Sequence, residues 1–464
     1  MMKRILAGAA LLGTAVSAQA ADLAVKAPYY KAPAAVVYDW TGFYIGVNAG
    51  VGLGRDRAQH VLPPSFDSLY LQPQGGLGGG QIGYNWQTGS VFGPLVLGVE
   101  ADIQGTGLRD SYTNLLTGGL LYNQKLDWFG TVRGRIGIAH GPVLSYVTAG
   151  YAYGSVNTTV TEGPPALTPG VFSTGNRMQS GWTVGSGVEA ALGGNWTGKI
   201  EYLYLNLGNK TDAFVLGGLG QTLNTEIREN IFRVGLNYRI GGNSMYVPVA
   251  AANWTGFYLG GNIGSGTARD RSSLTALPGI NEQFNLAPDG INGGVQAGYN
   301  WQAANWVYGL EADIQGSSQQ DNKTCVLFCN PAAGVSVAYD ATLPWFGTVR
   351  GRLGYSVGST LFYATGGYAY GSVKTKITVA GLPTVSLSET KSGWTGGAGI
   401  ETPFTFLGLF GPNWTSKTEY LYVDLGSSSA AVTGTTLLST TSVKEHIFRT
   451  GLNYHFNSPV VAKY

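Results

Sequence analysis

A series of short motifs occurs twice along the chain, in the same order and at nearly the same spacing. The sequence Trp-Thr-Gly-Phe-Tyr at 40–44 returns at 254–258. Self-similarity on this scale predicts that the chain folds as two copies of one structural unit. The other repeated motifs occupy 83–87 and 298–302, 100–105 and 311–316, 128–135 and 345–352, 150–156 and 367–373, 201–204 and 419–422, and 231–238 and 447–454.

The repeats divide the 464 residues into segments. A Pro/Ala-rich leader precedes the first copy, and a shorter echo of it at 247–252 precedes the second. We therefore expect the duplication to have copied a whole module. The expected segments are a signal peptide at 1–20, the leader at 21–37, a first repeat at 38–243, a linker at 244–252, a second repeat at 253–456 and a tail at 457–464.

The N-terminal residues have the pattern of a secretory signal. Lys3 and Arg4 precede an apolar run at 5–16, and Ala-Gln-Ala at 18–20 is a typical cleavage site. The run is shorter than the ~20 residues that a membrane-spanning helix needs. Gly, Asn, Glu or Arg interrupts every later apolar run. Any membrane span of the exported chain must therefore be a strand in a closed barrel.

Residues alternate between apolar and small or polar types at the start of each copy. Phe43, Ile45 and Val47 share one face of the expected strand, whereas Tyr44 and Asn48 share the other. A period of two is the signature of a β-strand. With 72 Gly, 27 Tyr and only 12% charged residues, the composition also favours strands and turns. Seven more strands per copy are expected, centred in the first copy near Tyr84, Glu100, Arg133, Thr148, Val184, Glu201 and Gly235.

The expected connections alternate in length, so that each loop of about twenty residues is followed by a short turn. This asymmetry is typical of a transmembrane barrel, which has long external loops and short periplasmic turns. Aromatic residues at the strand ends would form the two interfacial girdles of such a barrel. In the first copy these aromatics are Trp40, Trp86, Trp128, Trp182 and Tyr238.

Charged residues fall on the strand face opposite the apolar one. They would be costly against lipid, and a soluble barrel would carry them outside, so we expect them to fill a lumen as mutually paired side chains. The first copy contributes four acids and four bases, Glu100, Asp102, Glu189 and Glu201 with Arg133, Arg135, Lys199 and Arg233. The second contributes Glu311, Asp313, Glu401 and Glu419 with Arg350, Arg352, Lys417 and Arg449.

Each copy resembles the eight-stranded outer-membrane proteins of alphaproteobacteria, a porin family that includes immunodominant surface antigens. The motifs at 40–44, 83–87 and 128–135 and the final Gly-Leu-Asn-Tyr strand carry the resemblance. It implies localisation in the outer membrane of a Gram-negative bacterium, contact with outer-membrane lipid, and insertion by the barrel-assembly machinery. That machinery would recognise the last strand, whose aromatic residues are Phe448, Tyr454 and Phe456. Members are associated with envelope integrity, contact with host surfaces and, in some cases, haemin binding.

Two architectures and three functions follow from these patterns. Two separate barrels, each plugged by its own charges, would serve a structural and surface-display role, since eight strands leave room only for side chains. A single barrel of sixteen strands would be a diffusion channel. We favour two barrels because the charges balance within each copy. Haem or host-ligand binding by the loops ranks lower, because no His recurs at its counterpart in the other copy.

The remaining chemistry-bearing residues are few. Cys325 and Cys329 are expected to form a small disulfide loop, as suits an oxidising compartment. A zinc site is the alternative, but it would need two more ligands and no His lies near. No catalytic arrangement is apparent, so we expect neither an enzyme nor a cofactor. The net charge of +2 without a basic tract gives no indication of nucleic-acid binding.

Overall fold

A computed structural model describes residues 38–456, apart from 63–64, 91–92, 115–119, 163–169, 217, 242–251, 277–279, 325–336, 380, 405–409 and 433–436. Within these ranges the regular structure is β-strand, and no helix there is long and apolar enough to cross a membrane. The signal peptide, the leader, the linker core and the tail of the sequence prediction lie outside the described residues, as do Cys325 and Cys329.

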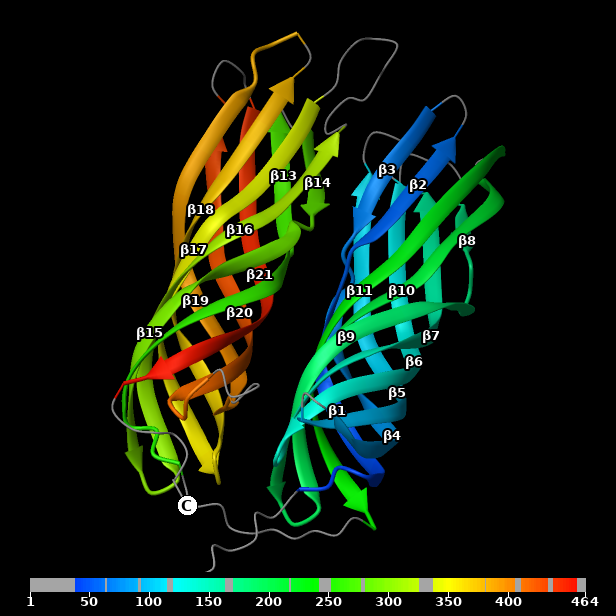
Figure 1. Ribbon diagram of the computed structural model, residues 1–464. Helices are drawn as coiled ribbons and strands as arrows, with labels where there is room; N and C mark the ends of the chain where they lie inside the picture. The colour runs from blue at the N-terminus through cyan, green and yellow to red at the C-terminus, as the bar shows by residue number, and fades with distance from the viewer. Residues whose placement is uncertain are drawn as a thin grey trace, which may run out of the picture. The chain divides into compact units, whose positions relative to one another are not determined.

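The first repeat forms a closed antiparallel barrel (Figure 1). Its first and last strands pair with each other from Phe43 opposite Ile240 to Gly54 opposite Glu229. The ring consists of β1 (Gly42–Gly54), β4 (Gln74–Ser90), β5 (Gly93–Asn114), β6 (Leu120–His140), β7 (Val143–Glu162), β9 (Arg177–Gly193), β10 (Trp196–Leu216) and β11 (Leu219–Ile240).

The second repeat closes in the same way. Its first and last strands pair from Tyr258 opposite His455 to Ala268 opposite Glu445. The ring consists of β12 (Gly256–Ala268), β15 (Asp289–Ala303), β16 (Trp306–Thr324), β17 (Val337–Val357), β18 (Thr360–Val379), β19 (Val385–Pro403), β20 (Trp414–Ala431) and β21 (Leu437–His455). The prediction of two eight-stranded barrels is therefore confirmed, and one sixteen-stranded barrel is not formed.

The strand register gives both barrels the same stagger. A path from Tyr44 through its successive cross-strand partners passes around the ring and returns to β1 at Gly54, ten residues further on. The equivalent path from Tyr258 returns to β12 at Ala268, again ten residues on. Eight strands with this stagger tilt by about 40°, and the interior has room only for side chains.

The long connections contain more strand than the sequence indicated. The first is a hairpin of β2 (Asp56–Leu62) and β3 (Ser65–Leu71), and β2 pairs with β11 beyond the end of β1. In the second barrel β13 (Asp270–Ala276) and β14 (Ile280–Leu286) form the equivalent hairpin. The connection between β5 and β6 is also mostly strand, because β5 extends to Asn114 and β6 begins at Leu120. The expected loops of about twenty residues are thus largely strand, with β8 (Val171–Ser173) added against β7.

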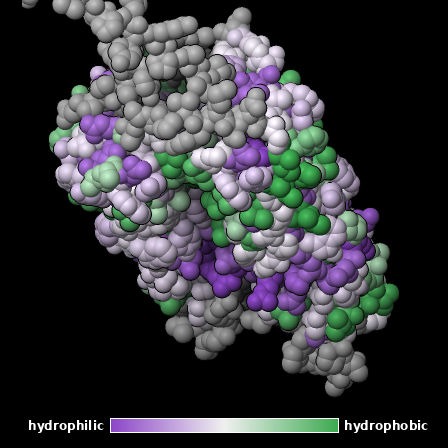
Figure 2. Space-filling view, turned by 90° about the horizontal axis from the view of Figure 1, so that it is seen from below, coloured by the Kyte–Doolittle hydropathy of each residue, from purple (hydrophilic) through white to green (hydrophobic). Residues whose placement is uncertain are grey.

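The outward faces of the strands are apolar and exposed. Val47 is 62% exposed, Ile103 56% and Val132 53%. Figure 2 shows clusters of hydrophobic residues on the molecular surface. An outer wall of this kind is stable against hydrocarbon but not against water. It is the lipid-facing belt that the alternation predicted.

Candidate functional site

The inward faces of the strands place the charged residues of each repeat in the lumen. Every acid and base of the sequence prediction is buried, with at most 5% of its surface exposed. Several are direct cross-strand partners, such as Glu100 with Arg133 and Glu201 with Arg233. The alternation of the strands thus brings each repeat's acids and bases into one layer, which we call the charged layer.

Arg133 lies at the centre of the charged layer of the first barrel. Its guanidinium pairs with Glu100, with Asp102 at 2.8 Å and with Glu201 at 3.0 Å. Arg233 joins Asp102 and Glu201 from the opposite wall, at 2.9 Å in the case of Asp102. Because Glu100, Asp102 and Glu201 each have at least two cationic partners, these residues form a connected network and not a set of separate pairs.

A second group of contacts completes the layer toward the end with the short turns. Arg135 pairs with Glu189 at 2.9 Å, and its guanidinium lies 4.8 Å from the ring centre of Tyr44 and 5.1 Å from that of Tyr146. The Tyr44 hydroxyl donates to Glu100 at 2.7 Å. The tyrosines therefore both stack on the cation and extend the hydrogen-bond network.

The second barrel repeats this geometry. Arg350 pairs with Glu311, Asp313 and Glu419, and Arg449 lies 2.9 Å from Asp313. Other contacts reproduce those of the first barrel, namely Lys417 with Glu311 at 2.9 Å, Arg352 with Glu401 at 2.7 Å, and the Tyr258 hydroxyl with Glu311 at 2.7 Å.

Glycine makes room for these large side chains. A Cβ at Gly83 would overlap the hydroxyl of Tyr44, and a Cβ at Gly298 would overlap that of Tyr258. The Tyr44 ring thus occupies the space beside Gly83 in order to reach Glu100. This packing explains why the Gly-Tyr-Asn-Trp-Gln motif begins with glycine in both copies.

An apolar layer, which sequence analysis missed, lies next to the charged layer, on the side of the long connections. In the first barrel Phe129 and Ile231 are fully buried beside inward-facing leucines. Both lie on the inward face, since they follow the same alternation as Arg133 and Arg233. The layer consists of Leu77, Leu108, Leu126, Phe129, Ala152, Val156, Leu203, Leu205, Leu207, Ile227 and Ile231. The lumen of the first barrel is therefore closed by a packed apolar plug as well as by ion pairs.

Two buried carboxylates lie at the level of this apolar layer. Asp56 and Glu229 are 1% and 0% exposed. Asp56 accepts a hydrogen bond from the backbone nitrogen of Arg228, but neither carboxylate oxygen of Glu229 has a hydrogen-bond partner in the described part of the chain. Asp56 begins the hairpin beyond the lipid-facing belt, and burial raises its pKa well above the usual range.

In the second barrel the equivalent carboxylate does have a hydrogen-bond partner. Glu445 is the counterpart of Glu229, and it accepts a hydrogen bond from the amide of Gln319. The residue at the position of Gln319 in the first barrel is Leu108. One polar substitution in the apolar layer thus supplies the partner that Glu229 lacks.

Trp40 does not belong to the interfacial girdle, so the sequence prediction is wrong for this residue, and its counterpart Trp254 in the second copy does not belong to it either. Both are fully buried. The Trp40 backbone nitrogen donates to Gln87 at 2.8 Å, and its indole donates to the carbonyl of Gly141 at 3.1 Å. The residue precedes β1, where the chain folds back over the lumen, so it closes the barrel end. Trp86, Trp182 and Tyr238 do face outward, with 49%, 50% and 39% exposed.

Three of the four histidines are buried and therefore poorly placed for haem capture. His60 is 2% exposed and contacts the Tyr122 hydroxyl and the Gln221 amide at 2.6 Å each. His446 and His455 are 8% and 3% exposed. A ligand histidine of a surface loop would have to reach solvent. In the described part of the chain there is also no group of three or more His, Cys, Asp or Glu side chains that could hold a metal ion.

A closed eight-stranded ring with an apolar outer wall and a filled, charged interior defines a transmembrane β-barrel protein. The family model of the outer membrane protein beta-barrel domain matches residues 8–239 and again 241–456. The chain belongs to this family, with two domains in tandem. Its place is the outer membrane of a Gram-negative bacterium.

Named relatives resemble one half of the chain. The 31 kDa outer-membrane immunogenic protein of Brucella melitensis is 37% identical over 251 residues, which are 51% of this chain and 100% of that protein. The 22 kDa outer membrane protein of Rhizobium leguminosarum is 35% identical, over 38% of this chain and 67% of that protein. Among solved structures, Neisserial surface protein A matches with 12% identity and a TM-score of 0.23, over 44% of this chain and 98% of that one.

Proposed function

We propose that the protein is a non-conducting scaffold of the outer membrane, whose two barrels display the connections at their outer ends on the cell surface. The plug carries this proposal, because a charged layer and an apolar layer both fill the lumen. A diffusion channel needs a continuous wet path, which packed leucines and a buried phenylalanine do not provide. Surface display also accords with the immunogenic relatives.

A catalytic role is not part of the proposal. The acids and bases of the charged layer pair with one another inside the lumen, so none is available to accept or donate a proton at a substrate. No cofactor is proposed either. The protein would act through its surfaces, namely the lipid-facing wall and the outer connections.

Conductance of the full-length protein in planar bilayers tests the proposal. We expect no stable single-channel steps, while a sixteen-stranded porin run in parallel gives large ones. Incorporation is verified by recovering folded, heat-modifiable protein from the same proteoliposomes. Reproducible ohmic steps from protein of verified fold would contradict a plugged lumen and indicate a channel.

We also propose recognition by the barrel-assembly machinery through β21. Tyr454 and Phe456 are 37% and 56% exposed, and their rings meet edge to face at the end of this strand, with the ring centres 5.2 Å apart. Replacing Phe456 by Ser should lower the heat-modifiable fraction in isolated outer membranes. The matched control is Tyr238→Ser at the end of β11, which closes the first barrel but is internal to the chain. Equal losses for both variants would indicate a general girdle effect.

A further inference from the structure

Some outward-facing side chains of the first barrel are buried, although a wall that faces only lipid would leave them exposed. Phe232 on β11 alternates with the inward Arg233, yet it is only 5% exposed, whereas Val234, the next outward residue, is 52% exposed. Val188 on β9 and Ile200 on β10 also face outward and are 9% and 7% exposed. These side chains pack against the second barrel, which belongs to the same compact unit of the chain.

The aromatic contacts between the barrels occur in pairs in which the roles of the two barrels are exchanged. The first barrel contributes the cross-strand partners Tyr202 and Phe232, and the equivalent partners of the second barrel are Tyr420 and Phe448. Tyr202 stacks on Phe448 with the ring centres 5.6 Å apart. Tyr420 in turn lies against Phe232, at 5.0 Å between ring centres. Such an exchange is the property of an isologous interface, in which two copies of one surface meet.

The strand ladder of each barrel is incomplete at the outer rim. In the described part of the chain β3 pairs only with β2, and the pairing of β5 with β4 ends at Arg109, so a gap in the ladder separates β3 from β5. We call this the rim gap, and its equivalent separates β14 from β16. Asp110 follows Arg109 and accepts a hydrogen bond from the backbone nitrogen of Gln72 at 2.8 Å. Its counterpart Asp321 accepts one from the backbone nitrogen of Ala287 at 2.8 Å. Each rim gap thus contains an aspartate that its own barrel anchors through one oxygen.

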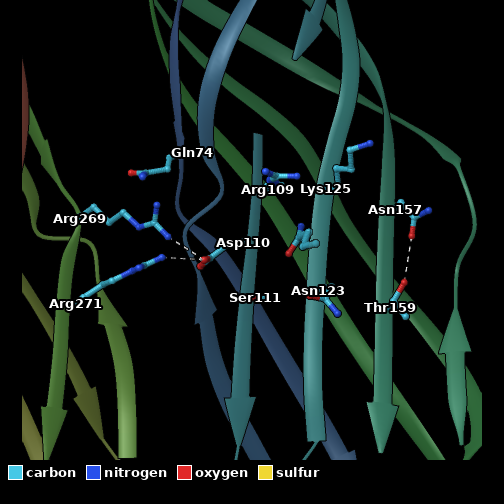
Figure 3. A pocket seen from close by; sticks show the side chains of 11 residues that line it. Gln74, Arg109, Asp110, Ser111, Asn123, Lys125, Asn157, Thr159, Arg269 and Arg271 are labelled. Atoms are coloured by element: carbon cyan, nitrogen blue, oxygen red, sulfur yellow. Dashed lines mark hydrogen bonds and ion pairs between the residues drawn. The ribbon is translucent and has the colours of Figure 1, made fainter. Parts of the chain in front are cut away.

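An arginine of the other barrel binds the second oxygen of each aspartate. Figure 3 shows Arg269 and Arg271 pointing toward Asp110, and the guanidinium of Arg269 lies 2.9 Å from its Oδ1. The counterpart of Arg269 in the first barrel is Arg55, whose guanidinium lies 2.8 Å from Oδ1 of Asp321. The side chains of these two ion pairs are between 3% and 15% exposed. Ion pairs buried to this degree fix the register of two surfaces, because breaking one leaves an uncompensated charge.

We propose that the two barrels of one chain bind each other in the membrane through an isologous interface, and that an arginine of each barrel binds at the rim gap of the other. The partner is the other half of the same chain, because the contacts come in exchanged pairs that only a second copy of the surface supplies. The outward apolar side chains give the interface its shape, since burial of apolar surface alone drives no association in lipid. The barrel interface consists of Arg55, Asp110, Val188, Ile200, Tyr202 and Phe232 with Arg269, Asp321, Tyr420 and Phe448.

Cleavage of the folded full chain between its barrels tests the proposal. A protease site inserted between positions 243 and 244 is cut in mild detergent, and an affinity tag in the leader retains the first half. We expect the second half to co-purify. The double variant Arg55→Gln with Arg269→Gln should release it about tenfold faster or more, because each broken pair leaves a buried carboxylate uncompensated. The matched control is Arg177→Gln, which breaks an ion pair with Asp212 within the first barrel and should leave the release rate unchanged.

A second pair of variants tests the aromatic contacts. Phe232→Ala should also speed release, whereas Val234→Ala, at the next outward position of the same strand, should not. Heat-modifiable mobility before cleavage shows that both barrels of every variant are folded.

Three results would overturn the proposal. Immediate separation of the halves of the parent protein would show that the barrels do not bind each other. Release from Arg177→Gln as fast as from the double variant would indicate a general effect of charge. Two uncut chains with different tags are also mixed, and their co-purification would identify a second copy of the chain as the partner instead of the other half.

Discussion

The two barrels share one charged layer but differ in the layer above it. The central arginine contacts the same three acids in both. In the apolar layer, Leu77 of the first barrel is replaced by Asn292 in the second, and Leu108 by Gln319. The charged layer is a network in which every member needs its partners. The apolar layer only has to fill space, so it tolerates a polar side chain that finds a partner.

The largest expected effect tests whether both charged layers are needed. Replacing Arg133 by Ala leaves Glu100, Asp102 and Glu201 without their shared partner in a buried site. Breaking buried pairs of this kind costs about 3–5 kcal/mol. The first barrel should lose heat-modifiability at a markedly lower temperature, and Arg350→Ala should do the same to the second. Arg109→Ala, an exposed arginine on the same barrel, is the control, and an equal effect there would contradict the network.

A smaller effect is expected where glycine makes room for tyrosine. Gly83→Ala places a methyl group against the Tyr44 hydroxyl and displaces its hydrogen bond to Glu100. Overpacking of this kind costs about 1–3 kcal/mol. Gly80→Ala is the matched control, because the Gly46 carbonyl oxygen would be the nearest atom of another strand to its Cβ, at an ordinary contact distance of 3.8 Å. Thermal unfolding of the two variants, followed by mobility on gels, should separate them, and equal melting would disprove the packing argument.

Exchange of one residue between the apolar layers sharpens the comparison. Gln319→Leu removes the donor to Glu445 and should destabilise the second barrel by about 1–3 kcal/mol, the cost of an unsatisfied buried polar group. Leu108→Gln should stabilise the first barrel, since it offers Glu229 the same donor. Denaturant unfolding of both variants measures the pair of effects. If both variants were destabilised, packing and not hydrogen bonding to the carboxylate would determine which residue is suited to this position.

The smallest effect is a dependence on pH. Because the folded-state pKa of Asp56 is raised, its contribution to stability is fully present below about pH 3.9, its unfolded value, and is lost as pH rises through the folded pKa. Asp56→Asn should therefore raise the unfolding temperature at neutral pH and flatten this pH dependence, with Glu229 left as the only acid of the pair. A variant with the same pH profile as the parent protein would contradict the shift.

Much of the interior was predictable from single strands, and some of it was not. The charged residues alternate with lipid-facing ones, so their direction followed from sequence. The same alternation from Arg133 also points Phe129 inward, a signal that sequence analysis left unused. Leu126 could not be found in this way, because a bulge between Leu126 and Trp128 reverses the alternation. Trp40 was misplaced because an aromatic residue before a strand is equally compatible with the girdle and with a buried plug.

The sequence by itself determined the class of fold, the duplication and the inward direction of the charges, because alternation and repetition are properties of neighbouring residues. Only the tertiary structure decided that each ring closes on itself. Closure depends on pairing between β1 and β11, whose residues lie far apart in the chain, and on a stagger of ten residues that accumulates over all eight strands. The same stagger brings the apolar layer over the charged one and leaves Glu229 at its level. No local pattern contains that information, because it arises only when the last strand meets the first.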